Sequence, residues 1–146
     1  MKNKLLYAGV VLVLFSCSST KSISNNQSQP KVDDKTFLIT EISTDPTYGL
    51  SPENPVDVGG VKDSQGPQNE KRYLNALTGP NGESISYYRA SSCCPIKSDN
   101  AMIGDKVLLD NYRVSWKGSE DTVSIYINMY DSNTLKAPVG FGLKKN

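Results

Sequence analysis

Hydrophobic and polar residues alternate most regularly in two segments of the C-terminal half of the chain. In residues 122–130 every second position from Val123 to Met129 is hydrophobic, and residues 107–116 alternate in the same way. A period of two is typical of strands that bury one face. The polar segment 117–121 (KGSED) between them indicates a hairpin loop. We therefore expect an antiparallel pair of strands here.

Further segments have strand or turn character without such clear alternation. Residues 36–44 (TFLITEIST) are rich in β-branched side chains and predict a strand. Residues 79–83 (GPNGE) have the composition of a tight turn, which favours a hairpin of residues 71–78 with residues 83–90. A short helix capped by Asn69 is the alternative that stays open for the first arm.

The strands predict a fold class. Residues 138–141 (PVGF) indicate a short edge strand, where proline is tolerated. With the segments above this makes about six strands, which would fold into a sheet with one apolar side. We expect a mainly β domain over residues 36–146, a small antiparallel sandwich or curled sheet.

The first 17 residues follow a different pattern. Lys2 and Lys4 precede an apolar run over residues 5–15. A basic head and an apolar run of about ten residues are typical of a secretory signal peptide, and the run is shorter than the about 20 residues of a membrane-spanning helix. The pair Ser16-Cys17 resembles the lipobox of bacterial lipoproteins. That resemblance implies removal of residues 1–16 and attachment of acyl chains, palmitate among them, to Cys17; an ordinary cleaved signal and an uncleaved anchor are the alternatives.

The segment after Cys17 indicates how the domain is held. Residues 18–35 are rich in Ser, Asn, Gln and Lys, so we expect residues 17–35 to form a lipidated, disordered tether. Ser18-Ser19 follow the cysteine, where lipoproteins retained in the inner membrane carry Asp. The resemblance therefore implies an outer-membrane protein on the periplasmic face, with the cell surface as the other possibility.

Composition excludes several functions. The chain contains no histidine, which removes Ser-His-Asp and Cys-His nucleophile activation and the commonest ligand of zinc, copper and non-haem iron. Loss of Lys2 and Lys4 with the leader would leave 14 of the 16 basic residues against 15 acidic residues. A charge this close to neutral predicts no nucleic-acid partner and no polybasic contact with anionic lipid.

Adjacent Cys93 and Cys94, followed by Pro95, are the most unusual local feature. In an oxidising compartment two thiols tend to pair, although neighbouring Cα atoms lie only about 3.8 Å apart, below the usual disulfide range of about 4.4–6.8 Å. Three interpretations stay open. The pair is a vicinal disulfide that stiffens the chain, a redox or Cu(I)-binding dithiol helped by Met102 or Met129, or two inert small hydrophobic residues.

Acidic, amide and tyrosine side chains complete the candidate chemistry. None of the acids and amides follows the spacing of a calcium loop, so we expect solvated turn residues and no metal site; they are Asp57, Asp63, Asp99, Asn100, Asp105, Asp110 and Asp131. The tyrosines form either an aromatic binding face or ordinary half-buried positions of a sheet; they are Tyr48, Tyr87, Tyr88, Tyr126 and Tyr130.

The chain contains a set of short motifs at residues 48–60 (YGLSPENPVDVGG), 66–77 (GPQNEKRYLNAL), 79–83 (GPNGE), 92–95 (SCCP), 126–131 (YINMYD) and 135–141 (LKAPVGF). Together these motifs resemble one group of small Gram-negative lipoproteins without established function. Some members carry the label 2-dehydro-3-deoxyphosphooctonate aldolase. That activity belongs to a (β/α)₈ barrel of about 250 residues, whereas this chain has 146 residues and no alternating βα pattern. We do not carry the activity over, and the resemblance implies no catalytic residues.

The sequence therefore predicts a lipid-anchored protein of the cell envelope, attached through Cys17. We expect a non-catalytic binding or scaffolding domain without a cofactor. Its partners would be the membrane, through the lipid, and an envelope protein or glycan. The alternative function is thiol–disulfide or Cu(I) chemistry at Cys93 and Cys94.

Overall fold

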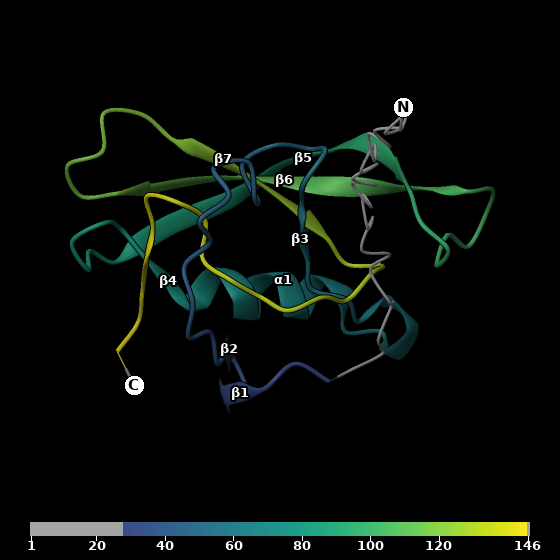
Figure 1. Ribbon diagram of the computed structural model, residues 1–146, viewed down its shortest axis with the longest axis horizontal. Coiled ribbons are helices and arrows are strands. Elements are labelled where there is room, and N and C mark those ends of the chain that lie inside the picture. The colour runs from purple at the N-terminus through teal and green to yellow at the C-terminus, as the bar shows by residue number, and fades with distance from the viewer. Residues whose placement is uncertain (1–27, 146) are drawn as a thin grey trace, which may run out of the picture.

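The computed structural model describes residues 28–145. The expected signal peptide 1–16 and the expected lipidation site Cys17 lie outside the described residues. The chain within them folds into a four-stranded sheet, one α-helix and two small two-stranded sheets (Figure 1).

The main sheet confirms the mainly β class. Its strand order is β3-β7-β6-β5, and the strands are β3 (Val56–Asp57), β7 (Val123–Asn128), β6 (Lys106–Trp116) and β5 (Ile85–Lys97). Strands β5, β6 and β7 are antiparallel, as expected, but β3 pairs with β7 in parallel. The sheet is therefore mixed and not purely antiparallel. Because β3 lies far upstream of β7 in the chain, no local sequence signal indicates this pairing.

Helix α1 (Gly66–Asn75) overturns the expected hairpin of residues 71–78 with residues 83–90. Its buried positions include Gly66, Glu70, Tyr73 and Leu74, which are spaced as one face of a helix. Pro67 lies in the first turn, where its missing N–H costs no hydrogen bond. The hairpin prediction was wrong because a glycine and an acid occupy half of this buried stripe and hide its period.

The turn at residues 79–83 is present as expected, but the two strands that flank it do not pair with each other. Gly79 N donates to Glu83 O at 2.8 Å. The arm before it, β4 (Leu77–Thr78), pairs with β8 (Gly142–Leu143), and the arm after it, β5, pairs with β6. The expected edge strand at residues 138–141 therefore lies slightly later in the chain, as β8.

The N-terminal part of the domain also differs from expectation. Strand β1 (Lys31–Asp33) pairs with β2 (Thr36–Phe37), so ordered structure begins within the segment expected to be a tether. Residues 36–44 do not form one strand; beyond β2 they make a single parallel bridge, from Ile42 to Ala137. Phe37 and Ile39 of this segment are buried in the core. Its backbone pairs with the loop after β7, where Ser43 N donates to Ala137 O at 2.8 Å.

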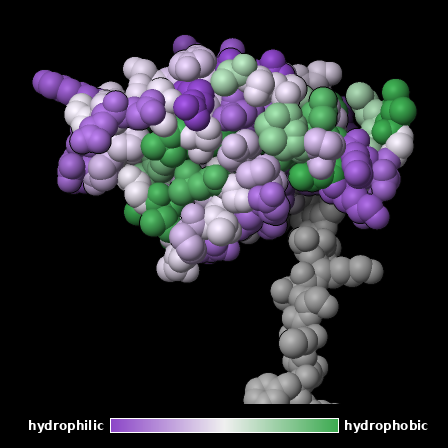
Figure 2. Space-filling view, turned by 90° about the horizontal axis from the view of Figure 1, so that it is seen from above, coloured by the Kyte–Doolittle hydropathy of each residue, from purple (hydrophilic) through white to green (hydrophobic). Residues whose placement is uncertain are grey.

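The core lies between α1 and one face of the sheet. Tyr73 and Leu74 of α1 and Val114, Ile125 and Ile127 of the sheet are fully buried in one cluster. Burial of such a side chain contributes about 1.5–3 kcal/mol, and the alternation predicted for β6 and β7 supplies these positions. Figure 1 shows α1 between the sheet and the β1–β2 pair. The short 3-10 helix η1 (Val61–Asp63) precedes α1. On the face seen in Figure 2, hydrophobic side chains gather in separate patches between hydrophilic ones.

Candidate functional site

The structure joins Cys93 and Cys94 in a disulfide between adjacent residues, with Cα atoms 3.7 Å apart. The pair lies in β5, where the register against β6 shifts between Cys93 and Ile96. Cys94 adopts a left-handed backbone conformation, with φ of 57°, which few residues other than glycine adopt. Both cysteines are half-exposed. The disulfide therefore marks a bulge in an edge strand that solvent can reach.

The two methionines suggested as additional copper ligands lie in different surroundings. Met102 is 78% exposed in the loop after β5. Met129 packs against the core beside Gly66 of α1. Within residues 28–145, no group of three or more His, Cys, Asp or Glu side chains is placed to hold a metal ion.

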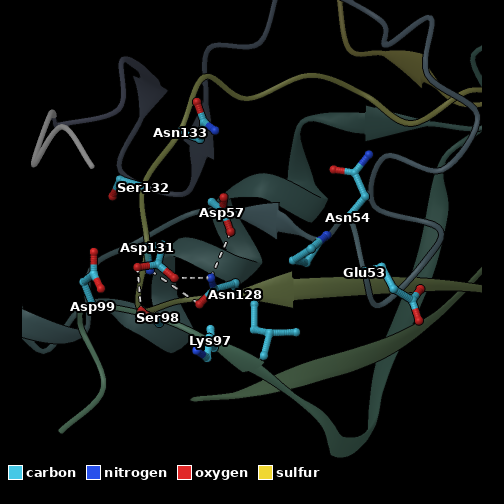
Figure 3. A pocket seen from close by; sticks show the side chains of 12 residues that line it. Glu53, Asn54, Asp57, Lys97, Ser98, Asp99, Asn128, Asp131, Ser132 and Asn133 are labelled. Atoms are coloured by element: carbon cyan, nitrogen blue, oxygen red, sulfur yellow. Dashed lines mark hydrogen bonds between the residues drawn. The ribbon is translucent and has the colours of Figure 1, made fainter. Parts of the chain in front are cut away.

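A polar pocket opens on the sheet face opposite α1, at the end of β7. Asp57 of β3 and Asn128 of β7 are paired in register, so their side chains project to the same face. Asn128 Nδ2 donates to Asp57 Oδ1 at 2.9 Å and to Asp131 Oδ2 at 2.7 Å. Figure 3 shows these three side chains pointing toward one another. Two carboxylates thus share one buried amide, and we call this place the Asp57 pocket.

The Asp57 pocket also holds the loop that connects β5 and β6. Asp131 Oδ1 accepts hydrogen bonds from Ser98 Oγ and from Asn100 Nδ2, both at 2.7 Å. Burial raises the pKa of Asp57 to about 6, and the nearby charge of Asp131 adds to this, whereas the hydrogen bond from Asn128 opposes it. Most polar groups here are satisfied by one another, which indicates a role in fixing the loop.

A second pocket lies between α1 and the edge of the sheet formed by β5 and β6. Its volume is about 500 Å³, within the range of about 300–1,000 Å³ that is typical of small-molecule sites. We call it the Glu70 pocket. It is lined by Pro67, Glu70, Lys71, Tyr87, Tyr88, Arg89, Asp110, Tyr112 and Met129.

An ion pair on the sheet forms the polar side of the Glu70 pocket. Arg89 contacts Asp110 through two hydrogen bonds, Nε to Oδ2 at 2.6 Å and Nη2 to Oδ1 at 2.7 Å. Ser92, directly opposite Asp110 in the register, donates from Oγ to Oδ1 at 2.7 Å. Asp110 is only 5% exposed. Since a buried carboxylate needs such partners, this arrangement holds both charged groups in one geometry.

Glu70 reaches the same pocket from α1 and is only 1% exposed. Its Oε2 accepts a hydrogen bond from the Tyr112 hydroxyl at 2.9 Å. Its Oε1 is buried and accepts no hydrogen bond from a donor among residues 28–145. Burial raises the pKa of Glu70 to about 7, and the negative charge of Asp110 raises it further, while Arg89 opposes this. A hydrogen bond between Glu70 and Asp110 raises this pKa as well, because the protonated Glu70 carboxyl has the carboxylate of Asp110 as an acceptor.

The sequence analysis did not single out Glu70 or Arg89, and it considered Asp110 only as a turn residue. Asp110 was expected to be a solvated turn residue, and this was wrong because it lies within β6. The signal was present, since Asp110 shares the alternating face of Tyr112 and Val114. Glu70 lies three and four positions before Tyr73 and Leu74, which is the spacing of one helix face, but this signal requires that the segment first be recognised as a helix.

No protein-family model, curated protein or solved structure matches this chain. Among residues 28–145, no helix has the length and apolar character needed to cross a membrane. The resemblance to small lipoproteins therefore stays a prediction from the motifs, and function has to be argued from the Glu70 pocket and from the leader sequence.

Proposed function

We propose that this chain is a lipid-anchored protein of the bacterial cell envelope, attached to the outer membrane through Cys17, whose β-rich domain binds an envelope component in the Glu70 pocket. The observation that carries the binding role is the cavity of about 500 Å³ between α1 and the sheet, whose walls combine aromatic side chains with the ion pair of Arg89 and Asp110. The basic and apolar leader before Cys17 supports the anchor.

Binding without catalysis is the role that the Glu70 pocket supports best. Asp110 is held by Arg89 and by Ser92, so its charge is already neutralised and serves to keep the guanidinium in place. A rigid polar wall reduces the entropy that is lost when a ligand binds.

Membrane fractionation tests the anchor. Cells that express the wild-type chain or Cys17→Ala are labelled with a palmitate analogue and separated into membrane and soluble fractions. We expect the wild type to carry label in the outer membrane, and Cys17→Ala to lose the label and leave the membrane. Double Cys93→Ser and Cys94→Ser is the matched control, because it removes the other cysteines and should keep label and location. Cys17→Ala protein that is still labelled and membrane-bound would refute the anchor.

A second candidate function is thiol–disulfide exchange at Cys93 and Cys94. It is favoured by the half-exposed position of the pair at a bulge of an edge strand. Mass spectrometry of protein taken from the envelope under thiol-blocking conditions distinguishes the two roles. A stable loss of two protons within one peptide indicates a structural bridge. Mixed disulfides with other proteins, or bound copper, indicate exchange or copper chemistry.

A further inference from the structure

Helix α1 carries a buried cation that has no opposite charge beside it. Arg72 is only 8% exposed. Its Nε donates to Asp34 O at 2.8 Å. Its Nη1 donates to Gln65 Oε1 at 3.0 Å and to Asn69 Oδ1 at 2.8 Å. These acceptors are neutral, and within residues 28–145 no carboxylate forms an ion pair with Arg72. Because a buried charge is usually paired with its opposite, the charge of Arg72 is uncompensated by the described part of the fold.

Arg72 lines a cavity of about 220 Å³, which we call the Arg72 pocket. The cavity lies beside α1 and is also lined by residues of β1 and of the loop after β7. Within the described chain Nη2 makes no hydrogen bond, and it keeps contact with solvent. The volume is below the range of about 300–1,000 Å³ that is typical of small-molecule sites. The pocket therefore suits a single functional group that reaches Nη2 of Arg72.

Two further side chains offer donors to the Arg72 pocket. Gln65 Oε1 accepts from Arg72, which fixes the amide, and Gln65 Nε2 makes no hydrogen bond among residues 28–145. Lys31 of β1 lines the pocket and forms no ion pair in the part of the chain that the structure describes. Asp63 adds a carboxyl group to the lining, but it is exposed and pairs with neither cation. Two cations against this one acid leave an excess of positive charge, which favours an anion.

The hydrogen bonds of Arg72 decide which kind of anion fits. A planar carboxylate binds best across two parallel N–H groups of a guanidinium. Both such pairs are closed here, since one needs Nε, which donates to Asp34, and the other needs Nη1, which donates to Gln65 and Asn69. The available donors are single groups on three side chains, Arg72 Nη2, Gln65 Nε2 and Lys31 Nζ. A phosphate group has several acceptor oxygens that point in different directions, so it can accept from separate donors.

We propose that the Arg72 pocket binds a phosphate group, whose oxygens accept hydrogen bonds from Arg72 Nη2 and Gln65 Nε2 and whose charge faces the ammonium of Lys31. The site is separate from the Glu70 pocket and depends neither on the ligand of that pocket nor on the lipid anchor. Free inorganic phosphate and the headgroup of a phospholipid are the two sources of such a group, and the same donors suit both.

Urea unfolding in different salts tests the assignment. The full-length protein is purified in a nonionic detergent and unfolded at constant ionic strength in phosphate, acetate or chloride, with the fluorescence of Trp116 as the readout. A ligand that binds only the folded state raises the free energy of unfolding. We expect phosphate to raise this free energy above its value in chloride, and acetate to leave it near that value. No increase in phosphate, or an equal increase in acetate, would overturn the assignment.

Gln65→Glu separates binding in the pocket from the general effect of phosphate on protein stability. The new carboxylate still accepts from Arg72, but it supplies a negative charge and removes the Nε2 donor, so calorimetry should show about tenfold weaker phosphate binding. Gln68→Glu makes the same charge change at an exposed position of α1 outside the lining and should bind as the wild type does. If Gln65→Glu does not fold, Lys31→Gln decides, with an expected loss of about threefold. Unchanged affinity of the deciding variant, or an equal loss in Gln68→Glu, would overturn the assignment.

Vesicle sedimentation distinguishes the two sources of the phosphate group. The lipid-free Cys17→Ala protein is mixed with vesicles of phosphatidylcholine, with and without phosphatidic acid, and centrifuged. Sedimentation that requires phosphatidic acid and is lost when Gln65→Glu is added assigns the group to a lipid headgroup. Binding of inorganic phosphate without such sedimentation assigns it to free phosphate. If neither is observed, the proposal is overturned.

Discussion

The buried carboxyl of Glu70 predicts that the domain loses stability as pH rises through neutrality. The pKa of Glu70 rises from 4.5 to about 7 on folding, chiefly because burial disfavours the charged form. A carboxyl whose pKa is higher in the folded state than in the unfolded state makes its full contribution to stability at pH values below the unfolded-state pKa. This contribution is lost as the pH rises through the folded-state pKa. A pKa difference of one corresponds to about 1.36 kcal/mol, so a difference of about 2.5 corresponds to about 3 kcal/mol.

Urea unfolding at several pH values measures this effect. Trp116 is the single tryptophan and packs edge-on against Phe141 at 5.4 Å between ring centroids, so its fluorescence reports unfolding. The lipid-free Cys17→Ala protein serves as the background. Between about pH 5 and about pH 8 we expect the free energy of unfolding to fall by about 2–3 kcal/mol, with part of the change below about pH 6 coming from Asp57, whose pKa is also raised.

Glu70→Gln isolates the contribution of Glu70. The amide has almost the same shape and cannot ionise, so its free energy of unfolding should be nearly independent of pH above about pH 6. Glu120→Gln, which removes an exposed carboxyl, is the matched control and should follow the wild type. A Glu70→Gln variant with the same pH dependence as the wild type, or a wild type that gains stability toward pH 8, would refute the argument.

Three further predictions concern other contacts. Asp131→Ala removes the acceptor that ties the loop 98–105 to the end of β7, so amide hydrogen exchange in that loop should accelerate; unchanged exchange would show that the loop is held by other means. Asp110→Ala removes the carboxylate partner of Arg89 and should lower the free energy of unfolding by about 1–3 kcal/mol in urea titrations; an unchanged free energy of unfolding would show that the ion pair does not stabilise the fold. Double Cys93→Ser and Cys94→Ser should lower the melting temperature, and an unshifted value would mean that the disulfide contributes nothing to stability.

The elements that could be predicted from the sequence are those whose signal is local. Hydrophobic and polar residues alternate along β6 and β7, and a polar loop joins the two strands. Both the strands and their antiparallel pairing can therefore be predicted from the local sequence. Helix α1 fails this test because Gly66 and Glu70 occupy two of its buried positions. The turn at residues 79–83 was read correctly, but its two arms pair with strands distant in the chain. Turn chemistry determines where the chain reverses, and only the full fold determines what each arm meets.

The Glu70 pocket illustrates why such sites escape sequence analysis. Its two carboxyl groups come from a helix and a strand 40 positions apart, and each alone resembles a solvated acid. What distinguishes them is burial, which arises only when α1 packs on the sheet and places Glu70 against Tyr112. The cost of that burial is what raises the pKa of Glu70. A polar residue at a position that the hydrophobic period assigns to the core is therefore the informative exception. Asp110, on the face of Tyr112 and Val114, is the position where that rule would have pointed to the pocket.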